Sequence, residues 1–255
     1  MWHDIRMLNA STNALLGALA LALLAVGAWW LAQRPMFTLK AIRIEGVQES
    51  ELRHVNPSTV RATALPRIRG NFFTADLDSV RTAFEAVPWV RKASVRREWP
   101  NQLIVTIEEH MPLGTWGEDG RLLSAKGDVF TANLDEAEED AELLQFSGPD
   151  GSEKEVVARY RELQTWFTPL GLAPKAVSLS GRYAWTIKLS NGMRVELGRE
   201  QTPTTLKSRV DRLIGVYPQL AARLQDRIVS VDMRYPNGLA LKADGLTLGS
   251  KGTKR

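Results

Sequence analysis

The chain has 255 residues, of which 44% are hydrophobic and 24% are charged, so it holds one or two ordinary globular domains and is not disordered throughout. It contains no cysteine and only three histidines, which excludes disulfides, thiol nucleophiles and zinc–thiolate sites. Residues 113–155 are strongly acidic and residues 156–255 are strongly basic. This basic part favours an anionic neighbour, such as lipid head groups, a cell-wall polymer or an acidic protein.

The N-terminal region carries a long apolar run. No charged residue lies between Met7 and Gln33, and Ala14–Ala32 is apolar throughout. At about 1.5 Å per residue, a helix over this run spans roughly the 30 Å hydrocarbon core of a bilayer. We therefore expect a transmembrane helix over residues 14–33, preceded by a cytoplasmic tail at residues 1–13. A cleavable signal peptide is the alternative, but such peptides have a shorter apolar core that ends in small residues.

Aromatic and basic residues follow at the far end of this helix. Trp29 and Trp30 suit the membrane–water interface, and Arg34 suits the head-group zone. Only Arg6 precedes the span, whereas several basic residues follow it, which by itself would keep the bulk of the chain inside. Long C-terminal domains are exported largely regardless of flanking charge, so we expect the rest of the chain outside the cytoplasm.

The segment after the anchor predicts a strand and a short helix. Ile42 and Ile44 alternate with charged residues, as in a half-buried strand. Asn56 and Pro57 are typical of a helix N-terminus. Because proline disfavours helix in the residue before it, this helix should end before Pro66.

A second helix and two strands complete this region. Thr74 or Asp76 caps the helix, which ends at Pro88, and the strands meet in a turn at Pro100-Asn101. The order β-α-α-β-β predicts an α+β domain over residues 37–110. Period-two alternation predicts these core-facing strand residues: Ala93, Val95, Arg97, Trp99, Leu103, Val105 and Ile107.

The remaining sequence, residues 111–245, predicts a larger mixed β-sheet domain with helices. Its clearest feature is a hairpin in which Asn191-Gly192, a preferred two-residue turn, joins two alternating strands. Strand patterns also cover Ile228–Tyr235 and the residues after Gly238, before a basic tail at residues 246–255.

Two long helices are predicted in this second region. Ser152 and Glu155 form a capping-box pattern before one of them. Thr202-Pro203 opens the other, which Pro218 should kink or interrupt. The run at residues 135–142 has six acids in eight positions and is typical of a solvated loop or exposed helical turn, with a cation or partner site as the alternative.

We find no sequence pattern for catalysis, a cofactor or a metal. Phosphate-binding loops, nucleophile elbows and metal-spaced histidines are absent from the sequence. Glu108-Glu109-His110 ends a strand, where adjacent residues point to opposite faces and cannot converge. Trp99, Trp166 and Trp185 fall on predicted core faces, which favours burial over carbohydrate stacking. Nucleic-acid binding is not expected, since basic residues in such strands normally face solvent.

The sequence ends in an amphipathic strand with little after it to cover its outer edge. Such an edge presents unpaired N–H and C=O groups, which are either blunted or used to add a strand from a partner. The pattern leaves both readings open.

Several stretches resemble one family. Phe37–Gly46 (FTLKAIRIEG) and Val87–Leu103 (VPWVRKASVRREWPNQL) resemble a POTRA domain. With Gly181–Thr186 (GRYAWT) and Val231–Gly238 (VDMRYPNG), the whole chain resembles the FtsQ/DivIB family of bacterial cell-division proteins.

This resemblance implies a non-catalytic scaffold at the division septum, without cofactors. It would be a single-pass inner-membrane protein with its N-terminus in the cytoplasm and its bulk in the periplasm, and it would bind the division proteins FtsB and FtsL. In the family, strand addition at the end of the second domain carries that contact. The corresponding residues here are Tyr235, Asn237, Gly238, Leu239, Ala240, Leu241 and Lys242.

Two other functions were considered. One is a POTRA-bearing accessory protein of outer-membrane protein export, although the region after Pro112 has too few strands for a large transmembrane barrel. The other is a membrane-tethered cell-wall enzyme, which would need converging carboxylates.

Overall fold

The computed structural model describes residues 5–47, 52–140, 142–224, 228–236 and 238–244. The chain divides into two compact units, Met1–Glu109 and His110–Arg255. Of the residues predicted to bind a partner, Asn237 lies outside the described residues, as does the basic tail.

Helix α1 (Ile5–Ala32) is long and apolar enough over Ser11–Ala32 to cross a membrane. These 22 residues extend about 33 Å, close to the thickness of a bilayer core. The leucines from Leu15 to Leu31 are exposed, as expected of side chains whose neighbours would be lipid. A short 3-10 turn, η1 (Pro35–Phe37), follows the helix.

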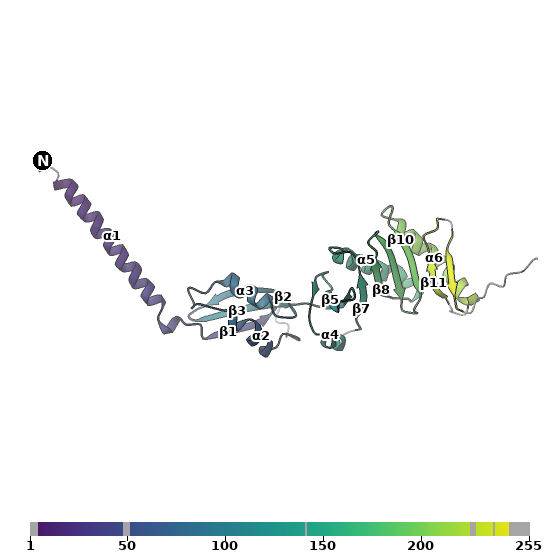
Figure 1. Ribbon diagram of the computed structural model, residues 1–255, viewed down its shortest axis with the longest axis horizontal. Coiled ribbons are helices and arrows are strands. Elements are labelled where there is room, and N and C mark those ends of the chain that lie inside the picture. Colours follow the sequence, from purple (N-terminus) through teal and green to yellow (C-terminus); the bar gives the residue numbers. More distant parts are fainter. Residues whose placement is uncertain (1–4, 48–51, 141, 225–227, 237, 245–255) are drawn as a thin grey trace, which may run out of the picture. The chain divides into compact units, whose positions relative to one another are not determined.

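The rest of the first unit has the predicted β-α-α-β-β order. Strand β1 is parallel to β3, and β2 is antiparallel to β3, so the sheet order is β1-β3-β2 (Figure 1). Its elements are β1 (Ala41–Gly46), α2 (Pro57–Thr63), η3 (Leu65–Arg67), α3 (Leu77–Glu85), β2 (Val90–Glu98) and β3 (Gln102–Glu109).

The helices begin where side chains can satisfy free backbone N–H groups. Asn56 caps α2 by accepting a hydrogen bond of 2.8 Å from the Thr59 N–H. Asp76, not Thr74, caps α3. Helix α2 ends at Thr63, before Pro66 as predicted, and that proline lies in η3, a separate 3-10 turn.

The predicted core of this sheet is correct except at its end. Leu103, Val105 and Ile107 are fully buried. Trp99, in contrast, is 67% exposed, because β2 ends at Glu98 and the strand alternation no longer applies in the turn that follows. Arg97 is also exposed, and its guanidinium donates hydrogen bonds to backbone carbonyls of the loop before α3.

The second unit is a nine-stranded mixed sheet in the order β12-β11-β10-β9-β8-β7-β4-β5-β6 (Figure 1). Its elements are β4 (Pro112–Trp116), β5 (Arg121–Ser124), β6 (Val129–Phe130), α4 (Leu134–Asp140), β7 (Leu144–Ser147), α5 (Glu153–Phe167), η4 (Thr168–Leu170), β8 (Pro174–Leu179), β9 (Ala184–Leu189), β10 (Arg194–Arg199), α6 (Thr205–Leu224), β11 (Ile228–Asp232) and β12 (Ala240–Ala243).

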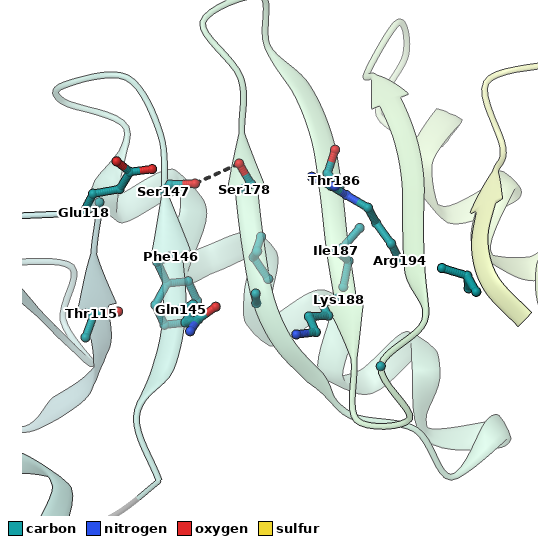
Figure 2. A pocket seen from close by; sticks show the side chains of 15 residues that line it. Thr115, Glu118, Gln145, Phe146, Ser147, Ser178, Thr186, Ile187, Lys188 and Arg194 are labelled. Atoms are coloured by element: carbon teal, nitrogen blue, oxygen red, sulfur yellow. Dashed lines mark hydrogen bonds between the residues drawn. The ribbon is translucent and has the colours of Figure 1, made fainter. Parts of the chain in front are cut away.

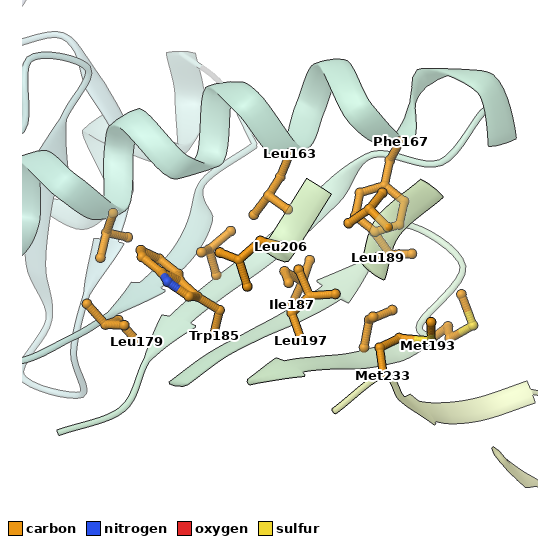
Figure 3. Packing of buried hydrophobic residues seen from close by; sticks show 14 of the residues in the cluster. Leu163, Phe167, Leu179, Trp185, Ile187, Leu189, Met193, Leu197, Leu206 and Met233 are labelled. Carbon is orange, nitrogen blue, oxygen red and sulfur yellow. The ribbon is translucent and has the colours of Figure 1, made fainter. Parts of the chain in front are cut away.

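The core of this unit lies between the sheet and helices α5 and α6. Trp185 and Ile187 on β9 face Leu163 and Phe167 on α5, with Leu206 of α6 beside them (Figure 3). Trp185 is therefore a core residue, as predicted, and Trp166 is partly buried against the same cluster.

The predicted hairpin joins β9 and β10. Asn191 Oδ1 accepts a hydrogen bond of 3.1 Å from the Met193 N–H, and Gly192 has φ +84°, which glycine adopts at no steric cost. The pairing shifts register between Glu196 and Gly198, a β-bulge that lies next to β11.

Two helix predictions are corrected. Ser152 precedes α5 but makes no side-chain cap, because its hydroxyl donates to the Pro149 carbonyl at 2.6 Å. Helix α6 begins at Thr205, after Thr202-Pro203, and continues past Pro218 to Leu224 without interruption. Residues 135–140 of the acidic run lie in helix α4, in which the described acidic side chains are exposed and Ala137 is buried.

Candidate partner-binding edge

Strand β12 is the terminal strand of the nine-stranded sheet. It pairs antiparallel with β11, placing Leu241 opposite Val231 and Ala240 opposite Asp232. No other strand in the described part of the chain pairs with its outer side. Because successive residues of a strand direct their N–H and C=O groups to alternate sides, this side offers backbone donors and acceptors to an added strand.

The side chains of the predicted binding residues point in different directions. Leu239 and Leu241 pack against the core, whereas Ala240 and Lys242 are exposed. Tyr235 is 55% exposed in the segment before β12. A partner strand would therefore meet the backbone of β12 and the outward side chains, while the two leucines hold the strand on the domain.

A shallow, mainly apolar hollow of about 470 Å³ lies at the start of β12. Its lining consists of Tyr235, Pro236, Gly238, Leu239 and Ala240. It could accept one apolar side chain at the end of an added strand.

Two arginines of α6 contact backbone carbonyls at this end of the sheet, Arg212 in the segment that leads into β12 and Arg209 at the end of β10. Arg212 donates from Nη1 to the Pro236 carbonyl and from Nη2 to the Met233 carbonyl at 3.4 Å. Arg209 donates to the carbonyls at the end of β10, at 2.5 Å to Leu197 and 2.9 Å to Arg199. Burial and the nearby positive charge of Arg212 lower the pKa of Arg209 from its usual value. Sequence reasoning missed both arginines, because the carbonyl groups that they contact lie on other elements of the fold.

A cluster of charged residues from β10, β11 and the residues just after β11 lies next to the segment that leads into β12. Arg234 donates to Asp232 from Nε at 2.9 Å and from Nη2 at 2.6 Å, and it pairs with Glu196 at 3.1 Å. The Arg234 hydrogen bonds hold the pKa of Asp232 below its usual value. Gly198 makes room for this arrangement, since a Cβ there would lie 2.8 Å from Arg234 Cγ.

The sheet face away from α5 and α6 holds a polar hollow of about 660 Å³ (Figure 2). Ser147 Oγ donates to Ser178 Oγ at 2.8 Å, and Lys188 and Arg194 lie on neighbouring strands. Glu118 is the one acidic residue among the described residues that line the hollow. This lining provides no pair of carboxylates for general acid–base catalysis.

The acidic pair and histidine at the end of β3 have separate partners. Glu109 accepts hydrogen bonds from the backbone N–H groups of Arg53, His54 and Val55, at 3.0, 3.1 and 2.7 Å. Glu108 pairs with Arg91, and His110 stacks on Phe130. Among the described residues, no group of three or more metal-ligating side chains is placed to hold a metal ion.

The residues predicted to lie at the membrane interface follow one another at the end of α1. Trp29 and Trp30 are exposed, and the guanidinium carbon of Arg34 lies 3.5 Å from the centre of the Trp30 ring. This is a cation–π contact between two residue types suited to the interface.

Comparison with known proteins assigns both units. Residues 37–110 match the family described as "POTRA domain, FtsQ-type", and residues 114–234 match "Cell division protein FtsQ/DivIB, C-terminal". The chain is 54% identical to the cell division protein FtsQ of Burkholderia pseudomallei over the full length of both chains.

Other relatives give the same result. The chain is 45% identical to the FtsQ of Bordetella pertussis, over 94% of this chain and 92% of the relative, and 37% identical to that of Nitrosospira multiformis, over 95% and 99%. These names describe cell-division proteins, so they favour the division prediction over export or wall hydrolysis. The chain belongs to the FtsQ/DivIB family of cell-division proteins.

Proposed function

We propose that this protein is a non-catalytic scaffold of the division septum that adds a strand of a partner protein to the outer side of β12. Helix α1 anchors it in the inner membrane, with the N-terminal tail in the cytoplasm and both units in the periplasm. The partners implied by the family are the small division proteins FtsB and FtsL. The scaffold thereby links early and late components of the division machinery.

The position and packing of β12 support this proposal. It is a terminal strand, its leucines pack on the core, and its backbone approach is fixed by Arg212. An edge held in this way loses little conformational entropy when a second strand pairs with it, which favours binding. The matched family region ends at residue 234, so the proposal rests on the geometry of the edge.

The outward side chains indicate what the added strand should carry. Ala240 leaves space for a larger side chain opposite it, and the exposed Lys242 favours an acidic residue across the pair. The hollow beside Tyr235 would take an apolar residue at one end of the partner strand.

The direct test measures binding of a purified FtsB–FtsL complex to the full chain in nanodiscs. Lys242→Pro removes a backbone N–H of β12 and fixes φ there, so we expect a loss of binding of at least tenfold, or about 1.4 kcal/mol. Thr131→Pro, an exposed position just after the opposite edge strand β6, is the matched control and should bind normally. Unchanged binding by a folded Lys242→Pro protein would refute strand addition at β12.

Depletion in cells tests the division role separately. Loss of the protein should give long filaments without septa under phase-contrast microscopy. Expression of the Lys242→Pro variant in the depleted cells should fail to rescue septation, whereas expression of Thr131→Pro should rescue it. Normal septa after depletion would contradict the proposed role.

A further inference from the structure

Four aromatic side chains gather at the start of the POTRA domain, and we refer to Phe37, Phe72, Phe73 and Trp99 as the aromatic cluster. The Phe37 ring lies 4.9 Å from that of Phe73 and 5.8 Å from that of Trp99, and the Trp99 ring lies 5.7 Å from that of Phe72. Phe37 and Phe72 are buried, but Phe73 is 48% exposed and Trp99 is 67% exposed. Two large aromatic residues that both contact Phe37 and Phe72 and remain exposed mark an interaction surface.

The aromatic cluster is tied to the end of α1. Asn71, next to Phe72, donates from Nδ2 to the carbonyl of Ala32, the last residue of the helix, at 2.8 Å. The Phe72 N–H donates to the Phe37 carbonyl at 2.9 Å. Phe37 follows Ala32 by only five residues, a span of at most about 17 Å. The surface next to the aromatic cluster is therefore the one from which α1 emerges.

Basic residues predominate around the aromatic cluster, although Glu98, which precedes Trp99, pairs with Arg43 at 3.9 Å. Residues 34–44 contain Arg34, Lys40 and Arg43 and no acidic residue, and residues 65–75 contain Arg67 and Arg69 and no acidic residue. Exposed aromatic side chains flanked by basic residues are the combination that holds peripheral segments at an anionic membrane surface.

We propose that the aromatic cluster is a second membrane-contact site, at which Phe73 and Trp99 enter the interfacial layer of the bilayer that α1 spans. Lys40, Arg67 and Arg69 then meet the phosphates of anionic phospholipids. The inference rests on the proposed anchoring by α1, and it adds that the POTRA domain itself binds lipid. Arg97 holds the loop that presents Phe73, since its Nε donates to the Phe72 carbonyl at 2.7 Å and its Nη2 to the Ala75 carbonyl at 2.7 Å.

The absence of cysteine allows a direct test with spin labels. Phe73→Cys and Trp99→Cys would be labelled with a nitroxide in the full chain, with one copy per nanodisc so that no second copy can cover the site. Ser94→Cys is the matched control, because Ser94 is exposed on the same strand that leads to Trp99. Leu19→Cys, in the middle of α1, reports on the anchor itself.

Collision with oxygen and with a water-soluble nickel chelate measures the depth of each label. In nanodiscs of phosphatidylcholine with phosphatidylglycerol, we expect the labels at positions 73 and 99 to collide several-fold less with the chelate than the label at 94. High salt or pure phosphatidylcholine should reduce this difference. Circular dichroism verifies folding, and using two label positions keeps the test valid if one variant misfolds.

Other outcomes would overturn the inference. Equal chelate access at 73, 99 and 94, with Leu19 protected, would mean that α1 anchors the chain while the POTRA domain stays off the lipid. Protection at 73 and 99 that requires a cell extract would assign the surface to a protein partner instead. Chelate access at Leu19 would show that the anchoring itself is wrong.

Discussion

The two edge strands of the nine-stranded sheet differ in length, and so in how many unpaired backbone N–H and C=O groups they offer. Strand β6 has only two residues, and its Phe130 stacks on His110 with ring centres 4.0 Å apart. Strand β12 has four residues, with alternating exposed and half-buried side chains. A very short edge strand offers few groups for pairing, whereas β12 presents a longer row. This difference is the reason for proposing strand addition at β12 and not at β6.

The largest expected effect is the loss of stability when a buried residue near either edge is replaced. Met233 and Leu122 are both fully buried, and replacing either with alanine should cost about 2–5 kcal/mol of unfolding free energy. Met233→Ala should also weaken FtsB–FtsL binding, because Met233 follows β11 and its carbonyl accepts from Arg212. Leu122→Ala should retain binding while folded. Denaturant unfolding and binding measurements on both variants test this, and equal binding by the two would contradict the comparison.

The next effect concerns the bulge in β10. Gly198→Ala forces a non-glycine residue to φ +75° and pushes its Cβ toward Arg234, at a cost of about 1–3 kcal/mol. Gly192→Ala is the control, since φ there is also positive but no atom lies within 4 Å of the added Cβ. We expect Gly198→Ala to lower the melting temperature more than Gly192→Ala. A larger fall in melting temperature for Gly192→Ala would show that the Arg234 side chain moves aside at little energetic cost.

Removing the Arg212 contacts should affect binding more than stability. Arg212→Gln loses the charged hydrogen bonds to the backbone before β12, worth about 1–2 kcal/mol, and allows the edge to move. Calorimetric titration should then show weaker partner binding with a more unfavourable entropy, because the edge must be ordered on binding. Thermal melting should shift by only a few degrees. Tight binding with unchanged entropy would show that the edge does not need this support.

The smallest effect is a dependence on pH near the open edge. The pKa of Asp232 is lowered in the folded protein, chiefly by hydrogen bonds from Arg234. Its contribution to stability is therefore complete above the unfolded pKa of about 3.9 and is lost as pH falls through the lower folded pKa. Asp232→Asn should flatten the melting temperature between pH 5 and about pH 2 relative to the wild type. Identical slopes for the two proteins would count against this role of Asp232.

Predictions that depend on a local sequence pattern are reliable only where the whole signal lies within a few residues. The hairpin at Asn191-Gly192 and the cap at Asn56 are confirmed because their signals act within four residues. Trp99 was wrongly assigned to the core because alternation says nothing about where a strand stops. Leu239 and Lys242 were predicted to bind a partner together. In the structure Leu239 packs against the core and Lys242 is exposed, so both could meet an added strand only through their backbone.

The sequence by itself determined the apolar span, the β-α-α-β-β order of the first unit, the hairpin at Asn191-Gly192 and the family, because these follow from hydrophobic periodicity, turn residues and motifs along the chain. It did not predict β8. The tertiary structure decided which strands lie at the edges of the sheet and which arginines hold them. Arg209 and Arg212 reach carbonyl groups 10 to 24 residues away along the chain. Such contacts arise only when α6 packs on the sheet, and no local pattern specifies them.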